Sequence, residues 1–203
     1  IRLAGSDRYS TAADVSYLWE DGSAPVVYLA SGTNFPDALA GAAAAGSMDS
    51  PVLLTAKDAL PAATAASLKR LKPKRVVVLG GTGSISSKVA SKAKAATGVT
   101  TSIVRQAGAD RYSTAVAVSK AAFPTPGVPV VYIANGTSFA DALAGAAAAG
   151  HRGGPVLLTS ASSMPASVVA ELKRLNPDRV VVLGGPSVVS NNVVKQISSA
   201  LGR

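Results

Sequence analysis

Arginine recurs at fixed places in two nearly identical motifs, one in each half of the chain. Residues 2–12 read RLAGSDRYSTA, and residues 105–115 read RQAGADRYSTA. The four arginines that recur in this way are Arg2, Arg8, Arg105 and Arg111. A guanidinium group is suited to bidentate contact with phosphate or carboxylate, so each of the four is a candidate contact for an anionic ligand. The equal alternative is a structural pair with a carboxylate such as Asp37 or Asp141.

Hydroxyl and amide side chains follow the first strand-like run of each half. They are Ser31, Thr33 and Asn34 in the first half, and Asn135, Thr137 and Ser138 in the second. In open α/β sheets ligands bind at the carboxyl ends of the strands, so this loop is the preferred polar site, with turn formation as the alternative. Asp37 and Asp141 follow in the first turn of a helix. There an interaction with the helix dipole is favoured over acceptance of a hydrogen bond from a sugar hydroxyl or an arginine.

A glycine-rich turn follows a later strand and opens a helix, which is the context of a phosphate cradle. Residues 76–86 read VVVLGGTGSIS, with Ser86 where a third glycine would be needed. The second half has Pro186 in the same turn, and proline lacks the N–H that would bind phosphate. We therefore interpret both turns as tight strand-to-helix connections. The competing hypothesis is a nucleotide-using enzyme with a phosphate site at Gly80 and Gly81.

Residues for catalysis are scarce. The chain has no cysteine and a single histidine, His151, so a Ser-His-Asp triad would exist in only one half, and a zinc site of His and Cys is excluded. The only carboxylate pairs that recur are Asp7 with Asp37 and Asp110 with Asp141. We expect a binding protein that is not an enzyme and that uses no cofactor or metal.

The charge balance indicates an anionic partner. The 203 residues carry a net charge of +9, which fits nucleic acid, an acidic membrane surface or an acidic polymer. Aromatic residues make up only 4%, which counts against base stacking, so no specific nucleic-acid binding is expected. The basic run at 69–75 is interpreted as a solvated helix face that adds nonspecific attraction. No apolar run approaches the length of a transmembrane segment.

The repeat sets the domain organisation. Matching motifs lie 103 or 104 residues apart, which is the size of a small domain, so we expect modules at 1–103 and 104–203. In the first module periodicity and turn residues predict helices at 7–19, 36–46, 60–72 and 84–96, and strands at 26–30, 52–55, 75–81 and, more weakly, 99–104. Strands that are apolar throughout and alternate with helices indicate a parallel sheet covered on both faces. The predicted fold class is α/β, with two tandem small doubly wound modules of the flavodoxin or Rossmann kind.

Four linked motifs, each occurring twice in the same order, resemble the cell wall binding repeat 2 family of surface proteins from clostridia and actinobacteria. The family pattern is R-x-AG-x-DRY-x-TA, then SG-x-x-F-x-DAL-x-G, then PVLL, then a strand ending in LGG. The first module carries these at 2–12, 31–41, 51–54 and 79–81. The second differs by Asn135 in place of Ser31 and Ala140 in place of Pro36. The resemblance covers essentially the whole chain.

The resemblance implies non-covalent anchoring of a surface protein to an anionic secondary polymer of the Gram-positive wall, outside the cell. It also implies three tandem modules around a pseudo-threefold axis, beside a separate effector domain. This chain departs from that pattern, with two modules and no effector. The alternatives are a fragment, a third module from another chain, or a different assembly. The final residues 201–203 stop where a further R-x-AG start would follow, which favours a fragment.

Overall fold

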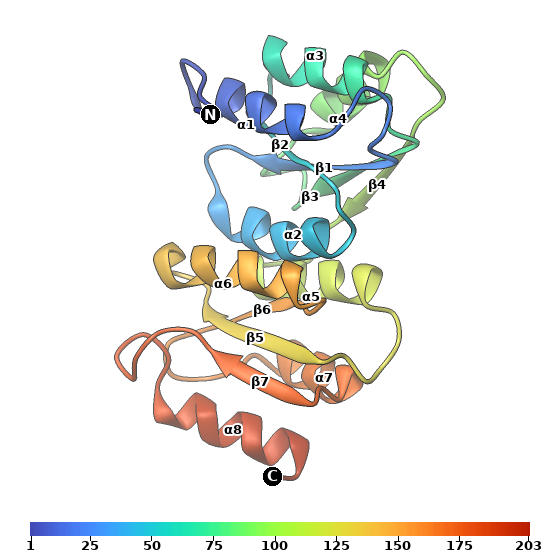
Figure 1. Cartoon of the computed structure of the whole chain (residues 1–203). Coiled ribbons are helices and arrows are strands. Elements are labelled where there is room, and N and C mark those ends of the chain that lie inside the picture. The colour runs from blue at the N-terminus through green and yellow to red at the C-terminus, as the bar shows by residue number, and fades with distance from the viewer. The chain divides into compact units, whose positions relative to one another are not determined.

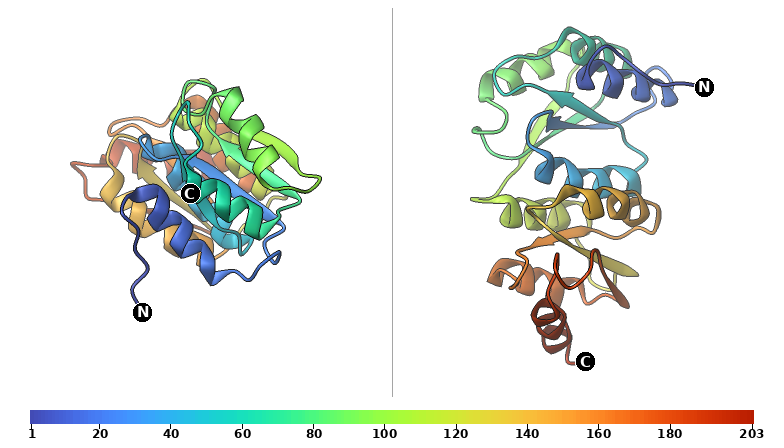
Figure 2. Two further views of the ribbon diagram at one scale, coloured as in Figure 1. Left: turned by 90° about the horizontal axis from the view of Figure 1, so that it is seen from above. Right: turned by 90° about the vertical axis from the view of Figure 1, so that its left-hand side faces the viewer.

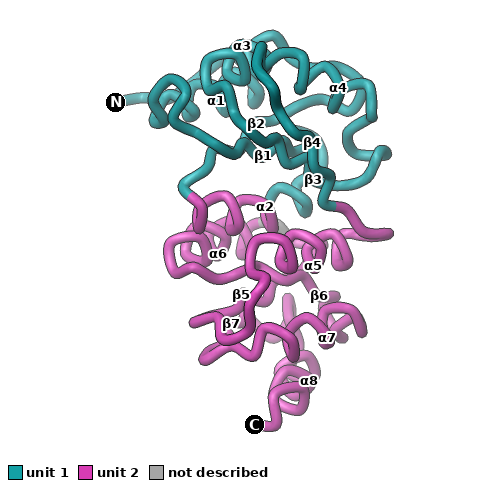
Figure 3. Tube along the Cα trace, turned by 90° about the vertical axis from the view of Figure 1, so that its right-hand side faces the viewer, with its two compact units in different colours: residues 1–38, 49–106 teal, residues 39–48, 107–203 magenta. Residues whose placement is uncertain are grey.

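The computed structural model describes residues 1–203, with only the backbone described for Phe139. It contains two compact units (Figure 3). Unit 1 comprises residues 1–38 and 49–106, and unit 2 comprises residues 39–48 and 107–203. The module boundary expected at 103–104 remains a prediction. The sheet of unit 1 includes residues on both sides of that position.

Unit 1 is built on a four-stranded parallel sheet in the order β2-β1-β3-β4 (Figure 1). Its strands are β1 (Val26–Ser31), β2 (Val52–Thr55), β3 (Arg75–Leu79) and β4 (Ser102–Gln106). Its helices are α1 (Arg8–Val15), the 3₁₀ turn η1 (Ser16–Leu18), α3 (Ala62–Leu71) and α4 (Ser87–Ala96). Helices α1, α3 and α4 lie side by side on one face of this sheet (Figures 1 and 2). Helix α2 (Phe35–Ser47) begins in unit 1, and its residues from Leu39 onward belong to unit 2.

Unit 2 repeats this arrangement with one strand fewer. Its sheet is parallel, in the order β6-β5-β7. The strands are β5 (Val130–Asn135), β6 (Val156–Thr159) and β7 (Arg179–Val182), and the helices are α5 (Arg111–Ala122), α6 (Phe139–His151), α7 (Ala166–Leu175) and α8 (Asn191–Leu201). Helices α5, α7 and α8 enclose one core with the sheet, and α6 packs against β5 and β6.

The central strands are buried on both faces because both bear apolar side chains. Val27 and Leu29 of β1 point into the core formed with α3 and α4. Tyr28 and Ala30 point the other way and are also buried. Successive side chains of a strand alternate between faces, so a strand covered on both sides must be apolar throughout, as the unbroken run VVYLA predicts.

The predicted doubly wound α/β class is confirmed by this topology. The strand order turns back between β1 and β3, so the crevice where ligands bind in such sheets opens at the carboxyl ends of these two strands. Strand β4 lies two to three residues later than expected. The first helix is also shorter than expected, because α1 stops at Val15 and passes into η1.

Helices α2 and α6 carry unusually small side chains. Each has 13 residues, and none of the helices in the described part of the chain is long and apolar enough to cross a bilayer. Within unit 2, Gly46 and Gly150 approach so closely that a Cβ on Gly150 would lie 3.0 Å from the Gly46 Cα. The absence of side chains at these two positions lets the two backbones touch.

Candidate functional site at the carboxyl ends of the strands

The recurring motif begins with an aspartate that caps a helix. In unit 1 the Asp7 carboxylate accepts a hydrogen bond of 2.7 Å from the Ser10 N–H, and the Ser10 hydroxyl accepts one from the Asp7 N–H. Asp110 and Ser113 make the same capping box in unit 2, also at 2.7 Å. These hydrogen bonds stabilise the ionised form and hold the pKa of Asp7 and of Asp110 below its ordinary value. The cap fixes the first turn from which Arg8 and Arg111 project.

The Ala-Gly pair of the motif is required by the same turn. The Gly5 N–H donates to the Thr11 hydroxyl at 3.1 Å, and a Cβ on Gly5 would collide with Ser10. Gly108 donates to Thr114 at 3.0 Å in unit 2. Most of the recurring motif therefore serves to fold the segment before the helix onto its first turn.

The arginine of the motif reaches the polar loop in both units. Arg8 Nη1 donates to the Gly32 carbonyl at 2.6 Å, and Arg111 Nη1 donates to the Gly136 carbonyl at 2.6 Å. This bond uses one of five guanidinium N–H groups. Among the described residues neither arginine forms an ion pair, so neither has the structural carboxylate partner that the sequence left open. Arg8 is exposed and Arg111 half-buried, with donors left to face an anion.

The loop that receives each arginine is shaped by its own side chains. In unit 1 the hydroxyls of Ser31 and Thr33 lie 3.2 Å apart. In unit 2 the Asn135 Oδ1 accepts from the N–H and hydroxyl of Thr137, at 2.8 and 2.7 Å. Ser31 and Asn135 are buried and form the turn, which agrees with the alternative reading of these two residues.

The outer loop positions differ from the buried ones. Thr33, Asn34 and Thr137 are exposed, and Ser138 is half-buried. These residues lie on the same loops as Gly32 and Gly136, to which the arginines are bonded. The structure therefore brings together Arg8 with Thr33 and Asn34, and Arg111 with Thr137 and Ser138.

Close packing around the loop glycine keeps this geometry. A Cβ at Gly136 would lie 2.9 Å from the Tyr112 ring and 3.0 Å from Arg111 Cδ. Gly32 is enclosed in the same way by Tyr9 and Arg8. The tyrosine of the motif thus packs against the loop backbone, and only glycine leaves room for both side chains.

The crevice between β1 and β3 holds a carboxylate. Asp37 is only 5% exposed, and Ser84 Oγ donates to its Oδ2 at 3.3 Å. A Cβ on Gly80 would collide with the same carboxylate, so Asp37 lies directly against the Gly80–Gly81 turn. Asp141 lies against Gly184 in unit 2. The Asp37 carboxyl group fills the space beside this turn, which opposes a phosphate site there.

The two remaining arginines occupy different positions from Arg8. Arg105 Nη1 donates to the Gly80 carbonyl at 2.7 Å, and burial lowers the pKa of this guanidinium. Arg105 therefore ties β4 to the turn after β3. Arg2 is exposed near the start of the chain, and no hydrogen bond or ion pair joins it to the described residues.

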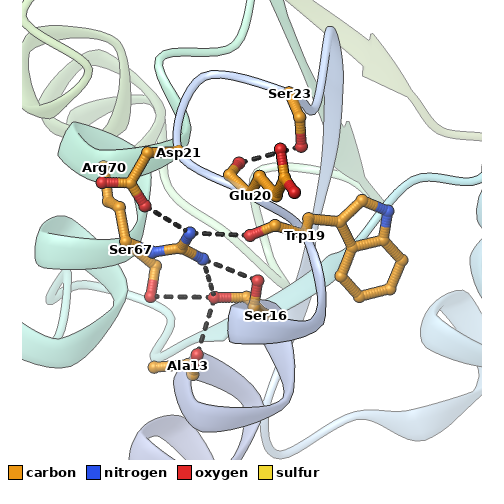
Figure 4. Close-up of polar contacts among 8 residues, drawn as sticks. All are labelled: Ala13, Ser16, Trp19, Glu20, Asp21, Ser23, Ser67 and Arg70. Atoms are coloured by element: carbon orange, nitrogen blue, oxygen red, sulfur yellow. Dashed lines mark hydrogen bonds and ion pairs between the residues drawn. The ribbon is translucent and has the colours of Figure 1, made fainter.

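Arg70 has a role that the basic run in the sequence did not indicate. Its Nη2 donates to the Ser16 carbonyl at 2.6 Å, and its Nη1 donates to the Trp19 carbonyl at 2.8 Å and to Asp21 at 2.9 Å (Figure 4). Its guanidinium also lies 4.4 Å from the centre of the Tyr17 ring. Arg70 is thus a cap for the end of α1 and η1, and not part of a solvated face.

Arg174 caps the end of α5 in unit 2, and it pairs with a different carboxylate. It donates to Glu171 through Nε at 2.8 Å and Nη2 at 2.7 Å, and to the Phe123 carbonyl at 2.8 Å. Glu171 is buried and accepts a further bond of 2.6 Å from Ser119. The pairing with Glu171 raises the pKa of Arg174. The preserved pair of arginines was visible in the sequence, but their partners were not, because Asp21 and Glu171 come from unrelated positions of the repeat.

Groups for other chemistry are not assembled here. His151 is the last residue of α6. Within the described residues, no three His, Asp or Glu side chains converge as a metal site would require. The arrangement offers arginine N–H donors, hydroxyls and amides, which suit the binding of an anionic, hydroxyl-rich ligand.

Two stretches of the chain, 2–90 and 105–194, match the model of a family described as cell wall binding domain 2 (CWB2). The chain is 33% identical over 199 residues to the N-acetylmuramoyl-L-alanine amidase LytC of Bacillus subtilis (strain 168), covering 98% of the chain and 38% of the amidase. It is 32% identical over 197 residues to the Amidase enhancer of the same organism, covering 97% of the chain and 26% of that protein.

Solved structures resemble the fold closely. Cwp6 from Clostridium difficile aligns with a TM-score of 0.89 and 33% identity, over 98% of this chain and 31% of that one. Cwp8 from Clostridium difficile aligns with a TM-score of 0.87 and 27% identity, over 98% and 33%. The chain therefore spans about a quarter to two fifths of the length of the proteins that it matches.

Proposed function

Since this chain belongs to the cell wall binding domain 2 family, we propose that it anchors a surface protein non-covalently to an anionic secondary polymer of the Gram-positive cell wall. Binding to the cell wall follows from the family, and the choice of an anionic polymer follows from the charges of the chain. A net charge of +9 attracts a polyanion. The hydroxyl and amide groups of the two loops suit the sugars of such a polymer.

One observation carries this proposal. An arginine bonded to a loop carbonyl, next to exposed loop hydroxyls, occurs in both units with the same 2.6 Å contact. An arginine held by one N–H presents the rest of its fork to an anion, in a fixed orientation that is suited to bidentate binding.

We assign the polymer contacts unequally among the candidate residues. Arg8, Thr33 and Asn34 in unit 1, and Arg111, Thr137 and Ser138 in unit 2, are the proposed contacts. Ser31, Asp37, Asn135, Asp141 and Arg105 shape the loops beneath them. Arg2 has no assigned contact in this proposal. Two weak sites on one chain add through avidity along a repeating polymer.

A catalytic function is not proposed. The matched family is a binding domain, and this chain corresponds to only 26–38% of the amidase and the enhancer that it resembles. The competing nucleotide hypothesis requires phosphate at the Gly80–Gly81 turn. The Asp37 carboxylate lies against that turn and disfavours it.

We propose further that the chain works on the outside of the cell, together with additional modules of the family in a pseudo-threefold assembly. Its own two modules divide near 103–104, as the repeat indicates. A third module, in the same chain or another, would add a third arginine and polar loop. Each further site that one polymer reaches would raise the avidity through its effective concentration.

Sedimentation with purified Gram-positive walls tests the anchoring proposal. The protein is mixed with walls before and after their secondary polymers are stripped, across a salt series and with DNA as competitor. We expect binding to intact walls that disappears with the polymer and survives excess DNA. Equal binding to stripped walls would contradict the proposal, and complete displacement by DNA would reduce it to nonspecific charge attraction.

A further inference from the structure

Strand β7 has an open edge at the position where unit 1 carries its fourth strand. In unit 1 β4 pairs with β3, whereas the sheet of unit 2 ends at β7 within the described residues. The exposure of the two strands differs accordingly. Val77 is 3% exposed and its counterpart Val181 is half-buried, while Gly80 is buried and its counterpart Gly184 is exposed. Strand β7 is thus apolar like a central strand, although no strand in the described part of the chain covers its edge.

The backbone hydrogen bonds between β3 and β4 in unit 1 show which N–H and carbonyl groups of β7 a fourth strand would bond. Ser102 N–H donates to the Lys74 carbonyl at 2.9 Å, and Gly80 N–H donates to the Gln106 carbonyl at 2.8 Å. N–H groups alternate in direction along a strand. Since Leu183 N–H donates to Ile133 of β5, the N–H groups of Val182 and Gly184 point to the open side.

Arg203 makes the hydrogen bonds to β7 that the start of a fourth strand would make. Its Nη1 donates to the Asp178 carbonyl at 3.0 Å, and its Nη2 donates to the Pro177 carbonyl at 3.1 Å. In unit 1 the matching carbonyls of Lys74 and Pro73 are bonded by Ser102 N–H and by the Thr101 hydroxyl. The side chain of Arg203 thus bonds the carbonyls that the segment at the start of β4 bonds in unit 1.

Helices α8 and α4 are followed by a glycine with the same left-handed backbone conformation. Gly202 has φ of 69°, and Gly98, at the same place in unit 1, has φ of 67°. The segment that leads into each module also has one pattern. An apolar residue, Arg, any residue, Ala and Gly occur at 1–5 and again at 104–108. A segment of this pattern therefore precedes each module, and the segment before the second module forms β4, which completes the sheet of unit 1.

We propose that the open edge of β7 binds a parallel strand of the β4 type, contributed by the segment that leads into a further module of this family. The strand pairs with β7 in the register of β4 on β3, and it displaces Arg203 from the Pro177 and Asp178 carbonyls. Its arginine donates to the Gly184 carbonyl as Arg105 donates to Gly80. Main-chain bonds provide the affinity, and the arginine selects the partner. This edge is separate from the proposed polymer contacts.

The test extends the full chain after Arg203 with a copy of residues 100–108 and measures amide hydrogen exchange by NMR. We expect exchange at Val182 and Gly184 to slow at least about tenfold, with a higher melting temperature. The control extension carries Val104→Pro in the copied segment, which removes an N–H donor directed at β7. This control should leave both amides close to their rates in the parent chain.

A second readout uses the unmodified chain. The peptide of residues 100–108 is titrated into it, and chemical-shift changes should gather on β7 and at Arg203. Unchanged exchange in the extended chain, or equal protection by the proline extension, would overturn the proposal. So would peptide-induced shifts that avoid β7. Cell walls take no part in the test, so its failure would leave the anchoring proposal standing.

Discussion

At the scale of single residues, two pairs of arginines that recur in the repeat have different contacts. Arg8 and Arg111 each use one N–H to hold a loop carbonyl and keep the others for solvent or ligand. Arg70 and Arg174 use most of their donors on backbone carbonyls and a carboxylate. Because Arg8 and Arg111 have few protein partners, their replacement should affect binding. Because Arg70 and Arg174 have many, their replacement should affect stability.

Replacing the loop arginines should weaken wall binding more than their charge explains. We expect R8Q/R111Q to reduce affinity for intact walls by at least about tenfold, because charge-assisted bidentate contacts are lost. The matched control K69Q/K173Q removes the same two charges from exposed positions on α3 and α7. It should lose much less, mainly at low salt. Equal losses in the two variants, at similar melting temperatures, would show that only net charge matters.

The capping aspartates predict a dependence of stability on pH. The folded pKa of Asp110 lies below its ordinary value of 3.8, so its stabilising contribution is present above that pH and is lost as pH falls through the folded pKa. Asp110→Asn keeps a capping oxygen but does not titrate. We expect its free energy of unfolding to fall less than that of the wild type between about pH 5 and about pH 2. Chemical denaturation at a series of pH values measures this, and parallel curves would exclude the role of Asp110.

At the scale of elements, each unit fastens the end of its first helix to α3 or α7 with an arginine and one carboxylate. The carboxylate is the exposed Asp21 in unit 1 and the buried Glu171 in unit 2. Ser67 stands where Glu171 does in the repeat, and Thr125 lies in the loop before β5 as Asp21 lies in the loop before β1. The two units thus pair the equivalent guanidinium groups of Arg70 and Arg174 with carboxylates from different elements.

This exchange predicts unequal costs and a rescue. Glu171→Ser should destabilise unit 2 by about 3 kcal/mol, since it breaks a buried pair. Asp21→Asn should cost at most about 1 kcal/mol, because that pair is exposed. Adding Thr125→Asp to Glu171→Ser should recover part of the loss by supplying the carboxylate from the loop. Urea denaturation gives these values, and no recovery in the double variant would refute the equivalence of the two arrangements.

The elements themselves were largely predictable from the sequence. Apolar runs such as VVYLA located the strands, and the DRY motif located a capped helix, because these signals are local. The end of α1 was misjudged, since apolar residues continue to Trp19 while the structure turns into η1 at Ser16. Arg70 holds that end by bonds to Ser16 and Trp19. Arg70 lies 51 positions from Trp19 and 54 positions from Ser16, so these contacts leave no local pattern in the sequence.

The candidate site was predicted in part for the same reason. The sequence offered Arg8 and the polar loop as separate candidates, and the structure joins Arg8 to Gly32 of that loop. Arg105 belongs to the same repeated motif as Arg2, yet it is tied to Gly80 while Arg2 is exposed. The difference arises because Arg105 lies in β4, which pairs with β3, and a repeat alignment cannot reveal that pairing.

At the scale of the whole molecule, duplication supplies two copies of the arginine and polar loop. If they bind polymer as proposed, a repeating polymer long enough to reach both copies would gain avidity. The segment between the two modules also forms β4, which completes the sheet of unit 1. The net charge of +9 predicts a long-range attraction to polyanions that weakens as salt rises.

The proposed function requires that the two polar loops, together with Arg8 and Arg111, bind an anionic wall polymer. Calorimetric titration of polymer released from Gram-positive walls into the purified chain tests it most directly. We predict saturable binding to the wild type and to K69Q/K173Q, and at least about tenfold weaker binding to R8Q/R111Q. Undiminished binding by R8Q/R111Q, or no binding of the released polymer by the wild type, would contradict the account.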